Sequence, residues 1–269
     1  MQYEPIKISL GNVFNKNPYL RILFYKLLDL LLLRAWHIKK ELRKIRKNHG
    51  NNLNILDAGS GFGQYTYFMS TLSNNWKITG VDVKQEQMDD CNNFFKKIGR
   101  SEKIQFNTAD LTQYVKPDEY NLILSVDVME HIKDDLVVFR NFYNSLKTGG
   151  ILLISTPSDQ GGSDVHDDKD KSFIAEHVRD GYNISDIEEK LKLAGFSRVE
   201  ARYTYGIPGK ISWKLSMKYP ISMLNLSKFF FILLPFYYLV TILFCMVLNF
   251  LDITFSYKTG TGLLVKAWK

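Results

Sequence analysis

The feature that most constrains the fold of this 269-residue chain is a short apolar run that ends in an acid and three alternating glycines. Residues 53–56 predict a buried strand, and the segment Asp57-Ala58-Gly59-Ser60-Gly61-Phe62-Gly63 predicts a turn into a following helix. Glycines let the backbone turn sharply and let a ligand reach the main chain, and the helix N-terminus adds free N–H groups. A second strand, residues 76–83, ends near Asp82, where an acid commonly binds two ribose hydroxyls. The chain therefore opens with a predicted nucleoside-binding βαβ unit.

The glycine spacing distinguishes between two kinds of nucleoside site. A dinucleotide fingerprint needs Gly-x-Gly-x-x-Gly, whereas here the third glycine is Gly63 and position 64 is Gln. The carboxylate of Asp57 would repel a pyrophosphate but suits an ammonium group. The segment resembles motif I of the class I S-adenosylmethionine-dependent methyltransferases, which reads hydrophobic-Asp/Glu-x-Gly-x-Gly-x-Gly.

Three further segments extend this resemblance to residue 155. After a third strand at 103–107, Asp110 and Leu111 match the family positions that meet the adenine amino group and pack on its ring; a helix N-cap is the alternative for Asp110. A fourth strand, 120–126, is almost continuously apolar, which is typical of a strand covered on both faces. It leads into the segment Asp127-Val128-Met129-Glu130-His131 and a fifth strand at 151–155. This segment is similar to the Glu-Val-x-Glu-His stretch of small-molecule and quinone-pathway methyltransferases, with Asp127 in place of the first Glu.

The resemblance implies a Rossmann-like, seven-stranded, doubly wound α/β sheet whose last strand is antiparallel. It also implies S-adenosyl-L-methionine as the cofactor, with the aminocarboxypropyl arm at the glycine loop, the ribose at the end of the second strand and the adenine after the third. The cofactor-binding residues carried over in this way are Asp57, Gly59, Ser60, Gly61, Gly63, Asp82, Val83, Asp110, Leu111 and Asp127.

Three histidines are candidates for the base that a hydroxyl acceptor needs, because imidazole titrates near neutral pH. His166 lies in a polar loop that follows the fifth strand and is expected to act as a substrate-side lid, and His177 comes just after it. These two are preferred over His131, which we expect to orient the donor. The acids around His166 offer a divalent-ion site as an alternative, but a solvated loop without a metal is the expectation.

The net charge of +7 is concentrated in residues 19–47, which carry nine Lys or Arg and two acids. Apolar residues at helical spacing predict one long helix, or two in line, over this segment. A basic arm on an anionic membrane surface and a helix packed over the core both agree with the pattern. Nucleic acid is not expected as a partner, because Trp36 is the only aromatic residue in the basic half.

An apolar insertion separates the predicted sixth strand, residues 196–205, from the only candidate for the seventh, residues 261–268. Residues 229–251 carry no charge, and as a helix they would be about 35 Å long, enough for a hydrocarbon core of ~30 Å. The seventh strand must return to the sheet, so a single crossing of the membrane is excluded. A hairpin that lies in the membrane plane or re-enters on the same side is favoured. The alternative is a cap helix buried against the core.

Four segments are expected: a basic helical arm (1–48), the methyltransferase core (49–205), the apolar insertion (206–257) and the last strand (258–269). The expected reaction is O-methylation of a lipophilic, aromatic or lipid-like small molecule at or near a membrane. The alternative is a non-catalytic, membrane-associated nucleoside-binding module of the same fold. Two cysteines in unrelated contexts and no visible secretory signal favour a cytoplasmic protein, peripheral on the inner face of the membrane.

Overall fold

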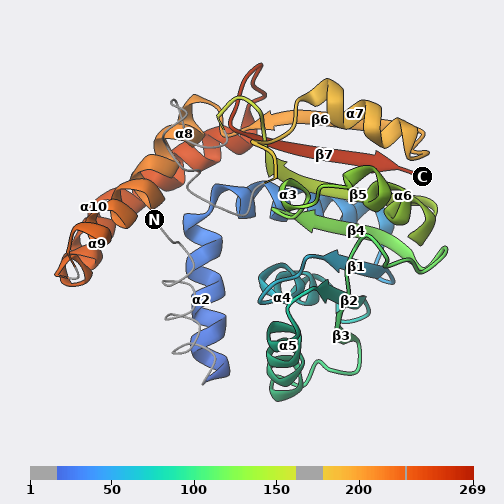
Figure 1. Cartoon of the computed structure of the whole chain (residues 1–269). Coiled ribbons are helices and arrows are strands. Elements are labelled where there is room, and N and C mark those ends of the chain that lie inside the picture. Colours follow the sequence, from blue (N-terminus) through green and yellow to red (C-terminus); the bar gives the residue numbers. More distant parts are fainter. Residues whose placement is uncertain (1–16, 162–177, 228) are drawn as a thin grey trace.

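The computed structural model describes residues 17–161, 178–227 and 229–269. Within these ranges, seven strands form one mixed sheet in the order β3-β2-β1-β4-β5-β7-β6 (Figure 1). The last strand, β7, pairs antiparallel with both β5 and β6, whereas the other pairs are parallel. The predicted Rossmann-like topology is confirmed. The strands are β1 (Asn54–Ala58), β2 (Lys77–Asp82), β3 (Ile104–Thr108), β4 (Tyr120–Val126), β5 (Leu146–Pro157), β6 (Arg198–Thr204) and β7 (Gly262–Trp268).

Helices cover both faces of the sheet. Side chains alternate along a strand, so Ile55 of β1 belongs to one hydrophobic core and Leu56 to the other. This two-sided burial explains the nearly continuous apolar runs of the central strands. One core is closed by α3 (Leu33–His49), α4 (Gln64–Leu72) and α5 (Gln85–Lys97), and the other by α6 (Asp135–Ser145) and α7 (Ile184–Leu193).

The basic N-terminal segment forms two helices that meet at a sharp bend. Helix α2 (Pro18–Leu31) ends where Leu32 takes the extended angles φ −90° and ψ 108°, and α3 then runs in a different direction (Figure 1). The expectation of one helix, or two in line, is therefore wrong. Helix α3 buries Ile38 and Leu42 in the core, so it packs over the sheet, as the second of the two alternatives proposed.

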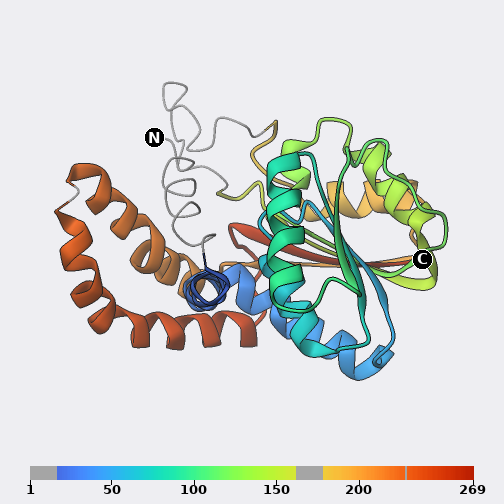
Figure 2. The same ribbon diagram turned by 90° about the horizontal axis from the view of Figure 1, so that it is seen from below.

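The apolar insertion forms a helical hairpin that projects away from the sheet (Figures 1 and 2). The two arms are joined by the hydroxyls of Tyr237 and Tyr238, which donate to the carbonyls of Leu215 and Ser216 at 2.7 and 2.8 Å. The first arm consists of α8 (Ile207–Trp213), the π-helical segment η2 (Lys214–Lys218) and α9 (Tyr219–Leu226), and the second arm is α10 (Phe230–Thr254).

Helix α10 is the one described helix that is long and apolar enough to cross a membrane. Only 11% of its most apolar 18-residue window is buried. The alternative of a cap helix buried against the core is therefore wrong, because most of α10 faces outward.

A buried carboxylate joins the base of the hairpin to the core. Asp252 is 0% exposed and accepts hydrogen bonds from the backbone N–H groups of Tyr205 and Gly209, both at 3.1 Å. The Nε2 atom of His37 in α3 lies 2.8 Å from its Oδ1. Position 209 must be glycine for this contact, since a Cβ there would lie 2.5 Å from Asp252 Oδ2. One side chain thus connects α3, the end of β6, α8 and α10.

Replacing Asp252 by Ala is expected to lower the free energy of unfolding by about 3 kcal/mol, because three buried donors lose their acceptor. Asp252→Asn keeps the shape and one acceptor oxygen and should cost less. Chemical denaturation followed by tryptophan fluorescence measures both changes. The control is Asp186→Ala, which removes an acid that is 46% exposed on α7. Equal stability of the Asp252→Ala and Asp186→Ala proteins would contradict this role.

Candidate active site

The glycine loop after β1 is held against the end of β2. The N–H groups of Gly59 and Ser60 donate to the carbonyl of Val81 at 2.7 and 3.0 Å. Gly59, Gly61 and Gly63 have φ values of 78°, 50° and 81°, in the left-handed region that favours glycine. A Cβ on Gly59 would lie 2.2 Å from a methyl carbon of Val128, whereas a Cβ on Gly61 would meet nothing within 4 Å. The main chain at Gly61 therefore borders open space, where a ligand can approach it.

Asp57 is a buried acid beside the glycine loop. It is 2% exposed and accepts a hydrogen bond from Thr66 Oγ1 at 2.5 Å. Burial raises its pKa to about 6; the hydrogen bonds from Thr66 oppose the shift, and the negative charge of Asp82 adds to it. An adjacent cation would offset this cost of ionisation, so the site suits an ammonium group.

Asp82 ends β2 on the other side of the same loop. Its Oδ2 accepts from the N–H of Gly61 at 3.0 Å and its Oδ1 from the N–H of Lys84 at 3.2 Å. The carboxylate is thus held beside the glycine loop, and the neighbouring side chain of Val83 is 64% exposed. The two residues predicted at the ribose lie at the strand end, as their sequence positions indicate.

The two residues predicted at the adenine follow β3. Asp110 is exposed, and its Oδ1 accepts from the N–H of Thr112 at 2.8 Å. The residues that follow form a turn and no described helix begins there, so the helix N-cap given as its alternative is wrong. Leu111 is 5% exposed and belongs to the core closed by α6 and α7. Both lie near the ends of β2 and β3, since the N–H of Ala109 donates to the carbonyl of Asp82 at 3.1 Å.

Asp127 follows β4 in a conformation that non-glycine residues rarely adopt. Its φ of 52° costs about 1–2 kcal/mol. Its N–H donates to the carbonyl of Ser155 at 2.9 Å, and its carboxylate forms an ion pair with Arg34 of α3. The backbone N–H of Arg34 also donates to the hydroxyl of Tyr205 at 3.0 Å, so the start of α3 is held between the ends of β4 and β6.

The sequence prediction missed Arg34 at this site. Its signal was present, since Arg34 is the only charged residue in the apolar run from Leu30 to Trp36. A lone cation within such a run often pairs with a buried or half-buried acid.

Glu130 was also missed. It lies next to His131 in the short 3-10 helix η1 (Met129–His131), is 1% exposed, and accepts from Thr156 Oγ1 at 3.1 Å. Burial raises the pKa of its carboxyl, against the opposing effect of nearby positive charge from His131 and Arg34. His131 is half-buried at the same strand end. The other predicted bases, His166 and His177, lie outside the described residues.

Helix α2 covers the outside of the glycine loop. Arg21 Nη2 donates to the carbonyl of Phe62 at 2.8 Å, and the hydroxyl of Tyr25 donates to the same oxygen. Arg21 is 2% exposed and also pairs with Asp90 of α5. Arg21, part of the basic surplus counted above, is therefore a buried residue that closes the loop and not part of a surface arm.

The donor set at these strand ends fits S-adenosylmethionine. A buried carboxylate suits its ammonium group, a second acid at the end of β2 suits the ribose, and a backbone without side chains borders the space between them. Among the described residues, no group of three or more His, Cys, Asp or Glu side chains could hold a metal ion.

Comparison with known proteins identifies the family. A family model described as a methyltransferase domain matches residues 19–201. The chain belongs to this methyltransferase family. The matched region begins inside α2 and ends inside β6, so the apolar hairpin lies beyond it.

The names of the curated relatives of this methyltransferase give different methyl acceptors. Phosphoethanolamine N-methyltransferase 1 of Triticum aestivum is 30% identical over 152 residues, which cover 55% of this chain and 29% of that enzyme. Malonyl-[acyl-carrier protein] O-methyltransferase 2 of Ilyobacter polytropus is 30% identical over 103 residues, 38% of this chain and 39% of that one. The chain thus matches less than a third of the length of the wheat enzyme.

Solved structures share the fold. Phosphoethanolamine N-methyltransferase 2 of Haemonchus contortus, in complex with S-adenosylmethionine, superposes with a TM-score of 0.63 at 18% identity, covering 87% of this chain and 53% of that one. An S-adenosylmethionine-dependent methyltransferase of Mesorhizobium loti has a TM-score of 0.55 at 17% identity, with 86% and 96% covered. The predicted family is confirmed, and with it the activity class of that family, methyl transfer, and its cofactor, S-adenosylmethionine. The solved structures confirm the fold.

Gly59 and Gly61 form a matched pair for testing the loop. Gly59→Ala is expected to destabilise the fold by roughly 2 kcal/mol, because its Cβ would overlap Val128. Gly61→Ala should cost about 1 kcal/mol of backbone strain but weaken S-adenosylmethionine binding at least tenfold, because its Cβ would enter the ligand space. Thermal unfolding and titration calorimetry separate the two effects. Donor binding that survives Gly61→Ala unchanged would contradict the proposed ligand position.

Donor binding is expected to weaken as the pH falls below about 6, where Asp57 takes up a proton. Affinity should fall by up to tenfold per pH unit, because the ammonium group needs the ionised carboxylate. The free energy of unfolding is expected to change with pH in the opposite direction. Because the pKa of Asp57 is raised from 3.8 to about 6 in the folded protein, this group destabilises the fold as the pH rises through that window. Titration calorimetry across this pH window measures how the affinity for S-adenosylmethionine changes with pH. Asp57→Asn should remove this pH dependence of donor binding. If the dependence is unchanged in that variant, another titrating group causes it.

Proposed function

We propose that this protein transfers the methyl group of S-adenosylmethionine to a hydroxyl group of a lipophilic, aromatic or lipid-like acceptor at the inner face of a membrane. The observation that carries the proposal is the apolar hairpin, which starts and ends at the edge of the sheet where the donor residues lie (Figure 1).

The outer face of α10 carries a stripe of apolar side chains exposed to solvent. Ten of its large apolar residues are between 39% and 78% exposed, and they recur at helical spacing. Transferring them into lipid would contribute on the order of 10 kcal/mol. A surface of this kind marks a site of contact with a membrane or an apolar partner. The residues are Phe231, Ile232, Leu233, Phe236, Leu239, Val240, Leu243, Phe244, Val247 and Phe250.

Most polar side chains on the inner face of the hairpin form hydrogen bonds within it, although Asn249 Nδ2 is buried without a partner among the described residues. Ser212 Oγ donates to Asn249 Oδ1 at 2.6 Å, and Tyr237 and Tyr238 bond to the carbonyls of η2. On α10, the polar side chains of Tyr237, Tyr238 and Asn249 therefore face the first arm, while the outward face is apolar, which favours a hairpin lying in the interface over a crossing of the bilayer. Anionic lipids of the cytoplasmic leaflet would attract the exposed cations of α3.

The residues at the strand ends are assigned roles in this reaction. The bound donor supplies an activated methyl group on a sulfonium. Asp57 and the glycine loop hold its ammonium-bearing arm, Asp82 the ribose and Asp110 the adenine. Helix α2, through Arg21 and Tyr25, covers the loop and excludes water.

An acceptor hydroxyl must lose a proton. His166 and His177 remain the predicted bases, and His131 orients the donor. The buried carboxyl of Glu130 lies next to His131 in η1, at the same edge of the sheet.

The proposal is tested by incubating the purified protein with methyl-labelled S-adenosylmethionine and a total membrane lipid extract. Label is expected in the organic phase, with Asp57→Ala reducing it at least 100-fold because the donor arm loses its carboxylate partner. Mass spectrometry of the product should place the methyl on oxygen. Label found only in water-soluble amines would contradict both the acceptor class and the reaction.

A pair of double variants separates the hairpin from general surface effects. Leu239→Glu/Leu243→Glu, placed on the exposed stripe, should retain donor binding but lose at least tenfold in lipid methylation. The control is Val137→Glu/Leu193→Glu, which changes two exposed apolar residues of α6 and α7. An equal loss of lipid methylation in both double variants would contradict a specific role of the hairpin in binding the acceptor.

A further inference from the structure

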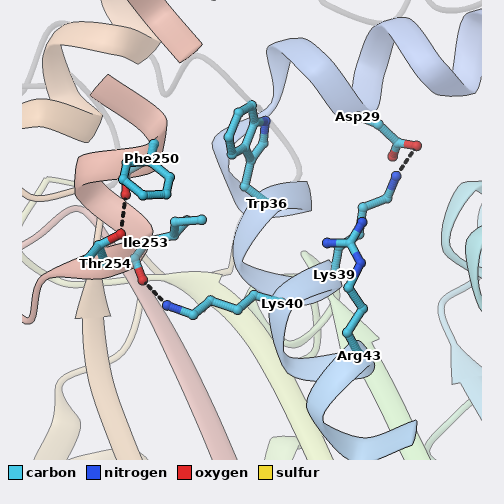
Figure 3. A pocket seen from close by; sticks show the side chains of 8 residues that line it. All are labelled: Asp29, Trp36, Lys39, Lys40, Arg43, Phe250, Ile253 and Thr254. Carbon is cyan, nitrogen blue, oxygen red and sulfur yellow. Dashed lines mark hydrogen bonds and ion pairs between the residues drawn. The ribbon is translucent and has the colours of Figure 1, made fainter. Parts of the chain in front are cut away.

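A groove of about 460 Å³ lies between α3 and the last turns of α10 (Figure 3). Trp36, Lys39, Lys40 and Arg43 line one wall, and the side chain of Phe250 contributes to the other. The groove is distinct from the glycine loop and the strand ends that hold the donor.

The four residues of the α3 wall share one helix face, because they follow one another at positions i, i+3, i+4 and i+7. Asp29 is the acid of the groove, and it is already paired with Lys39. Lys39 Nζ also lies 4.3 Å from the ring centre of Phe68, so its charge is largely engaged. The Cζ atom of Arg43 lies 5.3 Å from the centre of the same ring. Three cations and one acid line the groove, so its net charge is +2, and no acid among the described residues of the groove balances Lys40 and Arg43.

Lys40 lies where the two helices meet. Its ammonium donates to the carbonyl of Ile253 at the C-terminal end of α10, the end of a helix that attracts cations (Figure 3). Burial, followed by the positive charges of Lys44 and Arg202, lowers the pKa of Lys40. The three cations and one acid that line the groove leave positive charge in excess, and a bound anion would offset it.

The opposite wall opens directly onto the apolar stripe of α10. Phe250 is 58% exposed, and Val247, one turn earlier, is 57% exposed. The half-buried indole of Trp36 lies at the boundary between the cations and this stripe, a position that tryptophan favours at membrane interfaces. A ligand that fits this arrangement has an anionic head and an extended apolar tail.

We propose that the groove binds the phosphate group of an anionic phospholipid, with the acyl chains of that lipid lying along the exposed stripe of α10. Lys40 and Arg43 are the phosphate ligands, because both donate several N–H groups and Arg43 can bind two oxygens at once. The inference rests on the proposed membrane-facing role of the hairpin and adds to it a defined site for a lipid headgroup.

The test measures binding of the full chain to vesicles of phosphatidylcholine and to vesicles that also contain phosphatidylglycerol. The groove variant is Lys40→Gln/Arg43→Gln. The matched control is Arg46→Gln/Lys47→Gln, which removes the same charge from exposed positions of α3 outside the groove. The native protein and the control should bind anionic vesicles at least tenfold more tightly than neutral ones, and the groove variant should lose this difference.

The outcomes separate this inference from the proposed function. An equal loss in both double variants, or no loss in the groove variant, would overturn the site, since binding would then depend on overall charge or on other residues. If the native protein does not bind neutral vesicles, but the groove variant still loses the preference for anionic ones, the result counts against the membrane-facing hairpin and not against the groove. Inorganic phosphate that binds as tightly as the anionic vesicles and displaces them would reassign the groove to a free anion. Unchanged S-adenosylmethionine binding in each variant verifies that it is folded.

Discussion

The antiparallel pairing of β7 between β5 and β6 is the constraint on which the rest of this structure depends. Because β6 and β7 are neighbours of opposite direction, the chain that connects them must leave and return at the same edge of the sheet. That edge carries the glycine loop and the ends of β1 and β4. The helical hairpin is therefore confined to this side of the molecule, and Asp252 holds both of its ends there.

Much of the sheet could be predicted from the sequence because its signals are local. The apolar runs, the alternating glycines and the acids at strand ends each depend on a few adjacent residues, and β4 was predicted with the bounds it has, 120–126. The same holds for Asp57 and Asp82, whose positions at the ends of β1 and β2 follow from the pattern of the βαβ unit.

The parts that could not be predicted depend on contacts between distant residues. Arg21 and Arg34 read as charges of a surface arm, yet one is buried against Asp90 and Phe62 and the other pairs with Asp127. The bend at Leu32 that makes both contacts available has no Gly or Pro to mark it. Composition likewise could not tell an exposed α10 from a buried one, because the same apolar residues suit both surroundings.

The contacts of Asp252 also determine the direction in which the hairpin presents its apolar stripe. A helix held at one end by three directional hydrogen-bond partners from α3, α8 and the end of β6 cannot roll about its own axis without breaking them. The end of α10 is therefore held in one orientation relative to the strand ends. An apolar phase that took up α10 would meet the edge formed by the ends of β1 and β4 at a tilt that the fold of the chain determines, and not the partner.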